Sequence, residues 1–301
     1  MRAGWVLFGC AAAAALLPWS PYHASLLTMA LLLALLAASW HLLALGGRFS
    51  FGHAAFFGVG AYASALLASR GGAGMWAALP GGALTAAAVA IPVGALSLHL
   101  KGPYFSLATF AAAEILRVLA TNWTPLTAGA WGLVGLPPLP AQGALLAAGG
   151  IGGVLLVHTF LGRSRWGLAL AAIRQQQERA EGLGVPSRPL LFVTLVTSAG
   201  FAGYSGALYA HHVRSLEPAT AFGLLFSILP LIMALFGGTG SPAGPLVGAG
   251  VLYFLDELLL QPRFPAGHQL LYASAILLVL LGAPEGLVGF ARRHGGRRGA
   301  S

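Results

Sequence analysis

Few side chains in this 301-residue sequence could take part in chemistry, and they are not grouped as in an active site. The chain has seven acidic residues, a single lysine (Lys101) and a single cysteine (Cys10). Glu114 and Arg117 lie three positions apart, a spacing at which opposite charges pair on one face of a helix. In a membrane such a pair either stabilises its own helix or faces a polar pathway, and the sequence leaves both open.

The other candidate groups predict neither a metal centre nor an enzyme. His41, His99 and His158 occur singly, without the spacing of a metal site. The pair His211-His212 is expected to be solvated at an outer loop. Because the sequence contains no G-x-x-x-x-G-K-[ST] motif, it has no phosphate-binding loop for ATP.

The elements that must position these groups are apolar. Hydrophobic residues make up 57% of the chain and charged residues only 8%, whereas soluble domains carry about 25% charged residues. A helix needs about 20 apolar residues to cross a bilayer. We therefore predict an all-α polytopic membrane protein, a single transmembrane domain over 1–301, with about ten spans. They are expected near 3–19, 24–45, 54–69, 75–98, 103–121, 143–161, 189–210, 222–237, 244–260 and 267–284.

The positions of the arginines predict the orientation. With the N-terminus inside, only four of the 16 cationic residues lie outside, which fits the positive-inside rule. Both termini, including the basic tail near 286–301, are then cytoplasmic, and a nucleic-acid surface is not expected. We expect an uncleaved first span rather than a signal peptide. An inverted repeat of the two halves is left open.

A loop near 162–189 is the longest polar stretch between the apolar runs. From about 168 to 181 it has an apolar side and a polar side, and Gly182 and Gly184 end the predicted helix. A short amphipathic helix of this kind either lies in the headgroup layer or inserts into a groove of a partner protein.

The most informative segment, 46–67, is rich in glycine and aromatic residues. Small residues allow membrane helices to approach closely. We therefore predict a glycine-rich turn followed by a tightly packed helix, whose packing or pathway residues are Gly52, His53, Phe56, Phe57, Gly58, Gly60 and Tyr62.

This segment resembles the G-x-x-S-x-G-H-x-x-F-F-G-x-G-A-Y signature of the branched-chain amino-acid (LIV-type) ABC transporter permeases. The stretch 167–185 is similar to the loop by which those permeases contact their ATPases, although it has glutamines at 175–177 where acidic residues are common. The segments 102–105 and 122–124 resemble the second of the two permease paralogues.

The resemblance implies a non-catalytic permease subunit in the cell inner membrane, without a cofactor. Its implied partners are a paralogous permease, two ABC ATPase subunits inside and a soluble substrate-binding protein outside. The implied substrates are branched-chain amino acids or related small polar solutes. A urea or short-amide importer, and an ATP-independent secondary transporter, are the alternatives.

The resemblance also assigns residues to the two sites. Tyr104, Glu114 and Arg117 join the packing and pathway group. The residues expected to couple to the ATPase are Trp166, Leu168, Ala171, Ile173, Arg174, Arg179, Gly182, Leu183 and Gly184.

Overall fold

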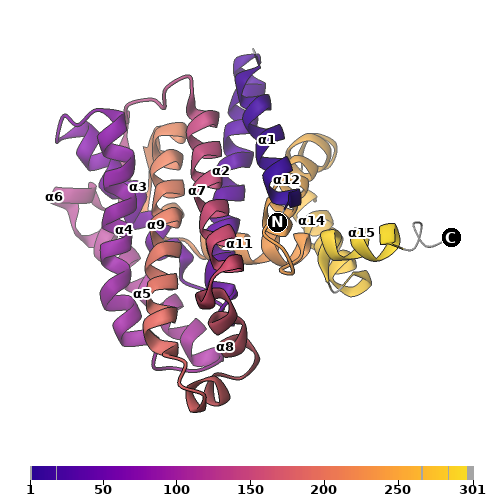
Figure 1. Ribbon diagram of the computed structural model, residues 1–301. Helices are drawn as coiled ribbons and strands as arrows, with labels where there is room; N and C mark the ends of the chain where they lie inside the picture. The colour runs from indigo at the N-terminus through magenta and orange to yellow at the C-terminus, as the bar shows by residue number, and fades with distance from the viewer. Residues whose placement is uncertain (1, 18, 266, 284, 297–301) are drawn as a thin grey trace.

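A computed structural model of the chain describes residues 2–17, 19–265, 267–283 and 285–296, and these are largely helical (Figure 1). The longer helices are α1 (Arg2–Leu16), α2 (Pro21–Ala44), α3 (His53–Ser69), α4 (Met75–Ser97), α5 (Pro103–Asn122), α7 (Gly143–Arg163), α8 (Arg165–Gly182), α9 (Ser187–Val213), α11 (Leu224–Gly237), α12 (Ala243–Phe254), α14 (His268–Gly282) and α15 (Gly286–Gly296).

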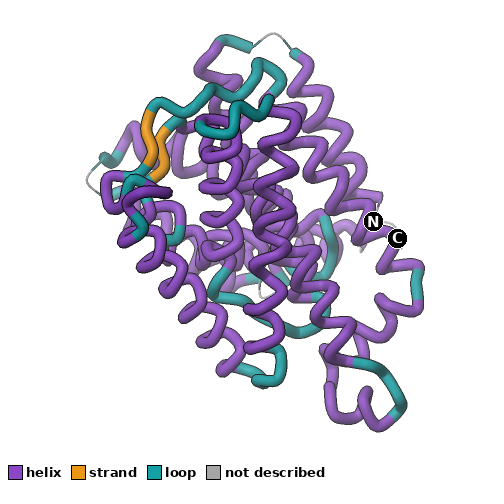
Figure 2. The backbone as a smooth tube through the Cα atoms, turned by 90° about the vertical axis from the view of Figure 1, so that its left-hand side faces the viewer, coloured by secondary structure: helices purple, strands orange, loops and turns teal. Residues whose placement is uncertain are grey.

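Shorter elements connect these helices. They are α6 (Thr124–Thr127), the 3-10 turn Gly129–Trp131, α10 (Pro218–Ala221), the π-helical segment Leu255–Leu260 and α13 (Gln261–Arg263). Two strands of two residues each, β1 (Leu133–Val134) and β2 (Ser215–Leu216), pair antiparallel with Leu133 opposite Leu216 (Figure 2). This ribbon ties the loop after α5 to the end of α9, at the opposite end of the bundle from α8.

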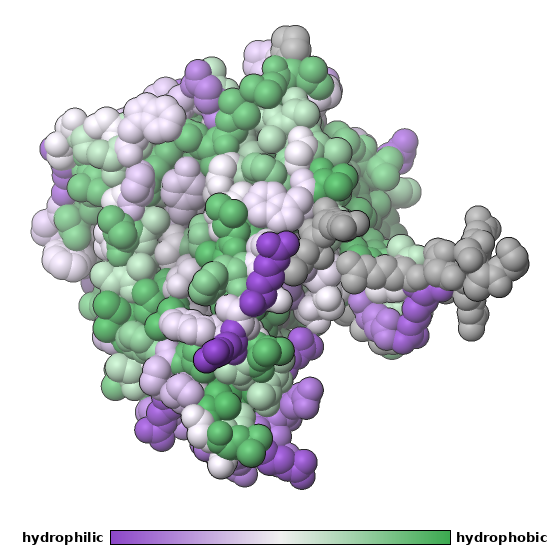
Figure 3. Space-filling view, viewed as in Figure 1, coloured by the Kyte–Doolittle hydropathy of each residue, from purple (hydrophilic) through white to green (hydrophobic). Residues whose placement is uncertain are grey.

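Seven helical segments of the described chain are long and apolar enough to cross a membrane. They are Pro21–Ala44, Met75–Ser97, Pro103–Asn122, Gly143–Arg163, Ser187–Val213, Pro218–Gly237 and Ala243–Arg263. Shorter apolar helices occur at Ala3–Leu16, His53–Ser69 and Leu270–Val279. Apolar side chains cover much of the sides of the molecule, and hydrophilic ones gather toward the end that carries α8 (Figure 3). The predicted all-α polytopic membrane fold is confirmed, whereas ten spans remain a prediction.

Helix α2 is the centre of the bundle. It packs against α7, α9, α11 and α12, and 89% of its most apolar stretch is buried. Its leucines at 32, 35, 36, 42 and 43 are inaccessible to solvent. A helix that is apolar on all sides is stable only when it is surrounded by other apolar surfaces, and four packed helices supply them here.

Glycines allow α3 to touch its neighbours through the backbone. A Cβ atom added to Gly60 would lie 2.2 Å from the carbonyl oxygen of Gly203 in α9. A Cβ atom on Gly52, just before α3, would lie 1.9 Å from the carbonyl oxygen of Thr109 in α5. These approaches are shorter than any Cβ contact tolerates, so the small-residue pattern brings α3 against α5 and α9 as predicted.

The first turn of α1 and the helix α15 lie beside the turn that joins α11 to α12. Trp5 Nε1 in α1 donates to Thr159 Oγ1 near the end of α7, at 3.1 Å. This arrangement agrees with termini on one side of a membrane, and which side that is remains a prediction. Residues 297–301 of the expected basic tail lie outside the described part of the chain.

Replacing Gly60 with alanine should destabilise the bundle, because the new methyl group would collide with backbone atoms that cannot move independently. We expect a loss of about 1–3 kcal/mol or more, typical of an overpacked core, measured as a fall in the thermal unfolding temperature in detergent. Gly149→Ala is the matched control, since nothing lies within 4 Å of a Cβ at that position in α7. Equal stability of the two variants would contradict the backbone contact.

Candidate coupling and translocation sites

Helix α8 projects from one end of the bundle as a separate amphipathic element (Figure 1). Its N-cap is Ser164, whose side chain accepts a hydrogen bond from the amide of Gly167 at 3.4 Å. It ends at Gly182, and Gly184 then takes a φ of +84°, a conformation that favours glycine at helix ends. The predicted amphipathic helix is therefore present with nearly the predicted bounds.

The two faces of α8 differ in part from the prediction. Leu170 and Ile173 turn inward, and the side chain of Ile173 is only 4% exposed. Because it packs within this chain, the expectation that Ile173 docks on a partner needs correction. The outward apolar side chains are Leu168 at 76% exposure, Leu183 at 85% and the half-exposed Trp166. The other predicted coupling residues, Ala171, Arg174, Arg179, Gly182 and Gly184, are also exposed.

A kink divides α8 at Gln176, whose φ of −158° and ψ of 104° are not helical. The next residue, Gln177, accepts a hydrogen bond from Arg48 Nη2 at 2.7 Å and donates one to Glu181 at 2.8 Å. The second half of α8 is thus tied to the turn between α2 and α3. Sequence reasoning missed Gln177 because a glutamine run at this place reads as a solvated face.

Arg48 is a buried cation that joins three segments, and only 5% of it is exposed. In addition to Gln177, it donates to the carbonyl oxygen of Leu100 at 2.6 Å, and its guanidinium lies over the ring of Phe105. Burial lowers the pKa of Arg48, although the charge of Glu181 opposes that shift. Arginine stays protonated under such shifts, so a positive charge sits between α5, α8 and the loop before α5.

The turn between α2 and α3, residues 45–52, is held by hydrogen bonds from several helices. Trp40 Nε1 donates to the carbonyl oxygen of Ser50 at 2.9 Å. The amide of Phe51 donates to Thr109 Oγ1 in α5 at 3.2 Å. Gly47, with a φ of +73°, passes close to the backbone of α8. The turn therefore forms a junction at which α2, α3, α5 and α8 meet.

His53 and the aromatic residues after it form the interior of the bundle. His53 Nε2 lies 3.1 Å from Ser198 Oγ, which in turn donates to the carbonyl oxygen of Ser39 at 2.6 Å. Phe57 stacks on Phe226. The predicted residues Phe56, Phe57, Gly58, Gly60 and Tyr62 are all buried, so within this chain they pack helices and do not line an open channel.

Helix α5, in contrast, presents an uncovered face. Only 28% of its most apolar stretch is buried, and Tyr104 is among its exposed side chains. Arg117 Nε donates to Glu114 Oε2 at 2.9 Å, so the predicted charge pair forms on this face. Charges that face lipid are costly, which means that this face needs a polar cavity or another protein against it.

The structure also places histidines where the sequence did not predict them. His41 and His158, 117 positions apart, stack with ring centroids 5.1 Å apart inside the bundle. The expectation that His211 is solvated is wrong, because it is fully buried and contacts Ser64 Oγ and the carbonyl oxygen of Pro137. No pattern in the sequence pairs His41 with His158, because the contact depends on how two separate helices are placed.

These features define a polytopic membrane protein with a projecting amphipathic helix and an uncovered charged face. Residues 22–282 match the family described as the branched-chain amino acid transport system permease component, and the chain belongs to this family. The predicted family is thus confirmed.

Three relatives show the range of similarity. The high-affinity branched-chain amino acid transport system permease protein LivM of Escherichia coli K12 is 27% identical over 82% of this chain and 65% of its own length. The high-affinity branched-chain amino acid transport system permease protein LivH of Escherichia coli K12 is 27% identical over 45% of this chain and 44% of its own length. The autoinducer 2 import system permease protein LsrC of Shigella flexneri is 26% identical over 62% of this chain and 57% of its own length. The chain thus spans less than two thirds of LivM, and no solved structure matches it.

Replacing Arg48 with methionine should loosen α8. The carbonyl oxygen of Leu100 and the side-chain oxygen Oε1 of Gln177 lose their hydrogen-bond donor. We therefore expect the free energy of unfolding to fall by about 1–3 kcal/mol. Hydrogen exchange of the amides at 177–182 should accelerate, as measured by mass spectrometry.

The matched control is Lys101→Met, which removes the exposed ion pair between Lys101 and Glu178 of α8. Lys101 holds the pKa of Glu178 below its usual value, but exposed pairs contribute little. If the amides at 177–182 exchanged at the wild-type rate in Arg48→Met, or equally fast in both variants, Arg48 would not be what holds α8 in place.

Proposed function

We propose that the chain is the membrane-spanning permease subunit of an ABC importer in the cell inner membrane, carrying branched-chain amino acids or related small polar solutes. The observation that carries this proposal is the family match over residues 22–282. The similarity to LivM over 82% of the chain supports the substrate class. The alignment with LivM covers more of the chain than that with LivH, which agrees with the second permease paralogue.

Energy must come from partner subunits in this proposal, because the sequence has no phosphate-binding loop. Two ABC ATPase subunits dock on the cytoplasmic end, where α8 projects. A soluble binding protein delivers substrate at the opposite end, near β1 and β2. The arginine distribution supports this orientation, since most cations lie on the side of α8.

Contacts of α8 suggest how ATPase movement reaches the membrane helices. Trp166, Leu168 and Leu183 are exposed apolar side chains of α8 and its end, and this outward set (the ridge) suits a groove in a partner. A displacement of the ridge pulls on Gln177, and through Arg48 it reaches the start of α5 and the turn before α3. The helices then move as rigid bodies and change the side from which the path is open.

The uncovered face of α5 supports a path between this chain and its paralogue. Glu114 and Arg117 carry charge on that face, and Tyr104 extends it toward α8. A partner permease laid against α5 would remove both charges from lipid and would leave them facing a polar passage for zwitterionic or polar solutes.

Replacing Leu168 with aspartate should weaken ATPase docking. A carboxylate on the ridge would be desolvated without a partner at a cost of about 1–3 kcal/mol, which corresponds to about tenfold or more in affinity. Co-purification of the ATPase and uptake of labelled leucine in proteoliposomes should fall together. Folding should survive because Leu168 is exposed.

The matched control for docking is Val134→Asp, a similar change at a residue that is 78% exposed at the opposite end. It should leave ATPase co-purification unchanged. If Leu168→Asp retained wild-type docking and uptake, α8 would lie in the headgroup layer and the proposed coupling would be excluded.

Neutralising the charge pair should separate a pathway role from a structural one. Glu114→Gln or Arg117→Gln alone leaves one unpaired charge and should impair both assembly with the paralogue and uptake. The double variant Glu114→Gln/Arg117→Gln restores neutrality, so we expect normal co-purification with the paralogue but uptake reduced about tenfold or more. Wild-type uptake by the double variant would show that the pair serves only its helix.

A further inference from the structure

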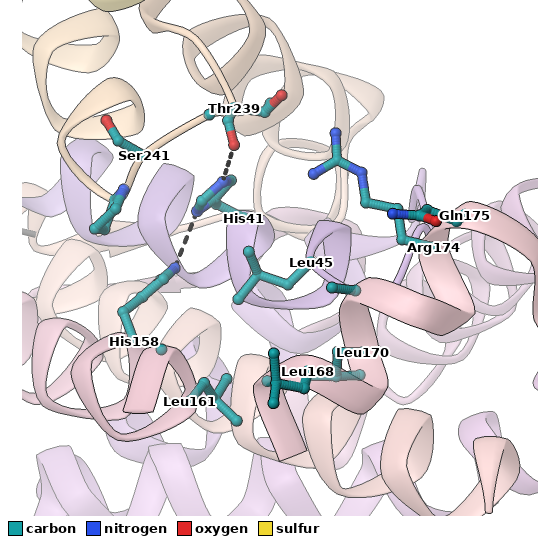
Figure 4. A pocket seen from close by; sticks show the side chains of 15 residues that line it. His41, Leu45, His158, Leu161, Leu168, Leu170, Arg174, Gln175, Thr239 and Ser241 are labelled. Atoms are coloured by element: carbon teal, nitrogen blue, oxygen red, sulfur yellow. Dashed lines mark hydrogen bonds between the residues drawn. The ribbon is translucent and has the colours of Figure 1, made fainter. Parts of the chain in front are cut away.

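A cavity of about 600 Å³ lies between α8, the ends of α2 and α7, and the turn from α11 to α12 (Figure 4). One part of its wall is apolar and includes Leu45, Leu161 and Leu168. The other part carries the ring of His41 and the guanidinium of Arg174. No acidic residue is among the described residues that line it. The cavity therefore combines aliphatic surface with cationic groups that have no counter-ion in its wall.

His41 and His158 share a chain of hydrogen bonds beside this cavity. His158 Nδ1 lies 3.0 Å from the carbonyl oxygen of Val154, and His41 Nε2 lies 2.9 Å from that of Thr239. His41 Nδ1 and His158 Nε2 lie 2.9 Å apart. All four ring nitrogens are thus engaged, two of them with backbone carbonyls and two with each other.

The protons in this chain can be counted. A carbonyl oxygen only accepts, so His158 Nδ1 and His41 Nε2 must each carry a hydrogen. The contact between the rings needs a third proton, because two bare nitrogens at 2.9 Å repel each other. Two neutral imidazoles carry one N–H each. A fully hydrogen-bonded arrangement would therefore require one additional proton and would carry a net charge of +1.

The surroundings oppose that charge. Arg174 of α8 brings a second positive charge into the same cavity. Glu285 lines a neighbouring pocket that Arg174 also borders, and it is paired with Arg293 of α15. The turn itself contributes Thr239 and Ser241, which do not ionise in this range. An anion in the cavity would offset both positive charges and so favour the additional proton between the two rings.

We propose that this cavity binds a small aliphatic carboxylate and that the His41–His158 pair takes up a proton as it binds. The carboxylate lies beside Arg174 and His41, and the alkyl group contacts Leu45, Leu161 and Leu170. An α-ammonium group would meet positive charges and no carboxylate, so the site selects acids that lack an amine. Because α8 forms one wall, the ligand joins α8 to α2 and α7.

The test is isothermal titration calorimetry of isocaproate with the purified full-length chain in detergent, in buffers of different ionisation enthalpy. We expect uptake of about one proton for each ligand bound, and an affinity that weakens by up to about tenfold for each unit of rising pH. Leucine, which adds the ammonium, and isocaproamide, which lacks the charge, should bind about tenfold more weakly or worse.

Variants separate the role of Arg174 in binding from the role of the histidine pair in proton uptake. Arg174→Gln should weaken binding about tenfold or more and leave proton uptake intact, whereas His158→Gln should abolish proton uptake. The matched controls are Arg165→Gln, an exposed arginine of the same helix, and His99→Asn, an exposed histidine outside the cavity. Both should behave as the wild type.

The proposal is overturned if isocaproate does not bind the wild-type chain, or if it binds without proton uptake. Tighter binding of palmitate than of isocaproate would also overturn it, because the cavity would then be a lipid site. Loss of binding in the two control variants would show that the response does not come from this cavity.

Discussion

The burial of the turn between α2 and α3 constrains the rest of the structure more than any other feature. Irregular backbone that is buried among helices is stable only where its polar groups find hydrogen-bond partners. Here Trp40, Ser106 and Thr109 hold residues 49–51 by hydrogen bonds, and the glycines beside them let other helices approach. The positions of α3 and α5 follow from that pairing. Arg48, from the same turn, then fixes the second half of α8.

This dependence links the two proposed sites. The outward ridge of α8 and the uncovered face of α5 lie on different surfaces, but both are connected to the same turn, α8 through Gln177 and α5 through Thr109. Neither link is an apolar contact, in which side chains can shift gradually against each other. Each is a directed hydrogen bond to a buried group, and its loss leaves that group unsatisfied. The two surfaces are therefore expected to move together or not at all.

The sequence predicted the helices well and their mutual rotation poorly. The apolar run predicted at 75–98 agrees with Met75–Ser97, and the glycine spacing after 46 predicted the tight packing of α3. The inward direction of Ile173 was not predictable, because apolar side chains occur on both faces of α8 and only the neighbouring helices decide which face is buried. The pairing of His41 with His158 depends on the depth and rotation of two separate helices, and no local pattern encodes either.

The charged face of α5 has a consequence for how the protein is made. A copy that inserts alone exposes Glu114 and Arg117 to lipid, and the bilayer must thin or admit water around them. Such a copy differs physically from an assembled one in a way that a membrane protease or chaperone can detect. In the proposed pairing, surplus subunits are marked for removal by the same side chains that the assembled complex uses, and balanced synthesis of the two permeases becomes a condition for the survival of either.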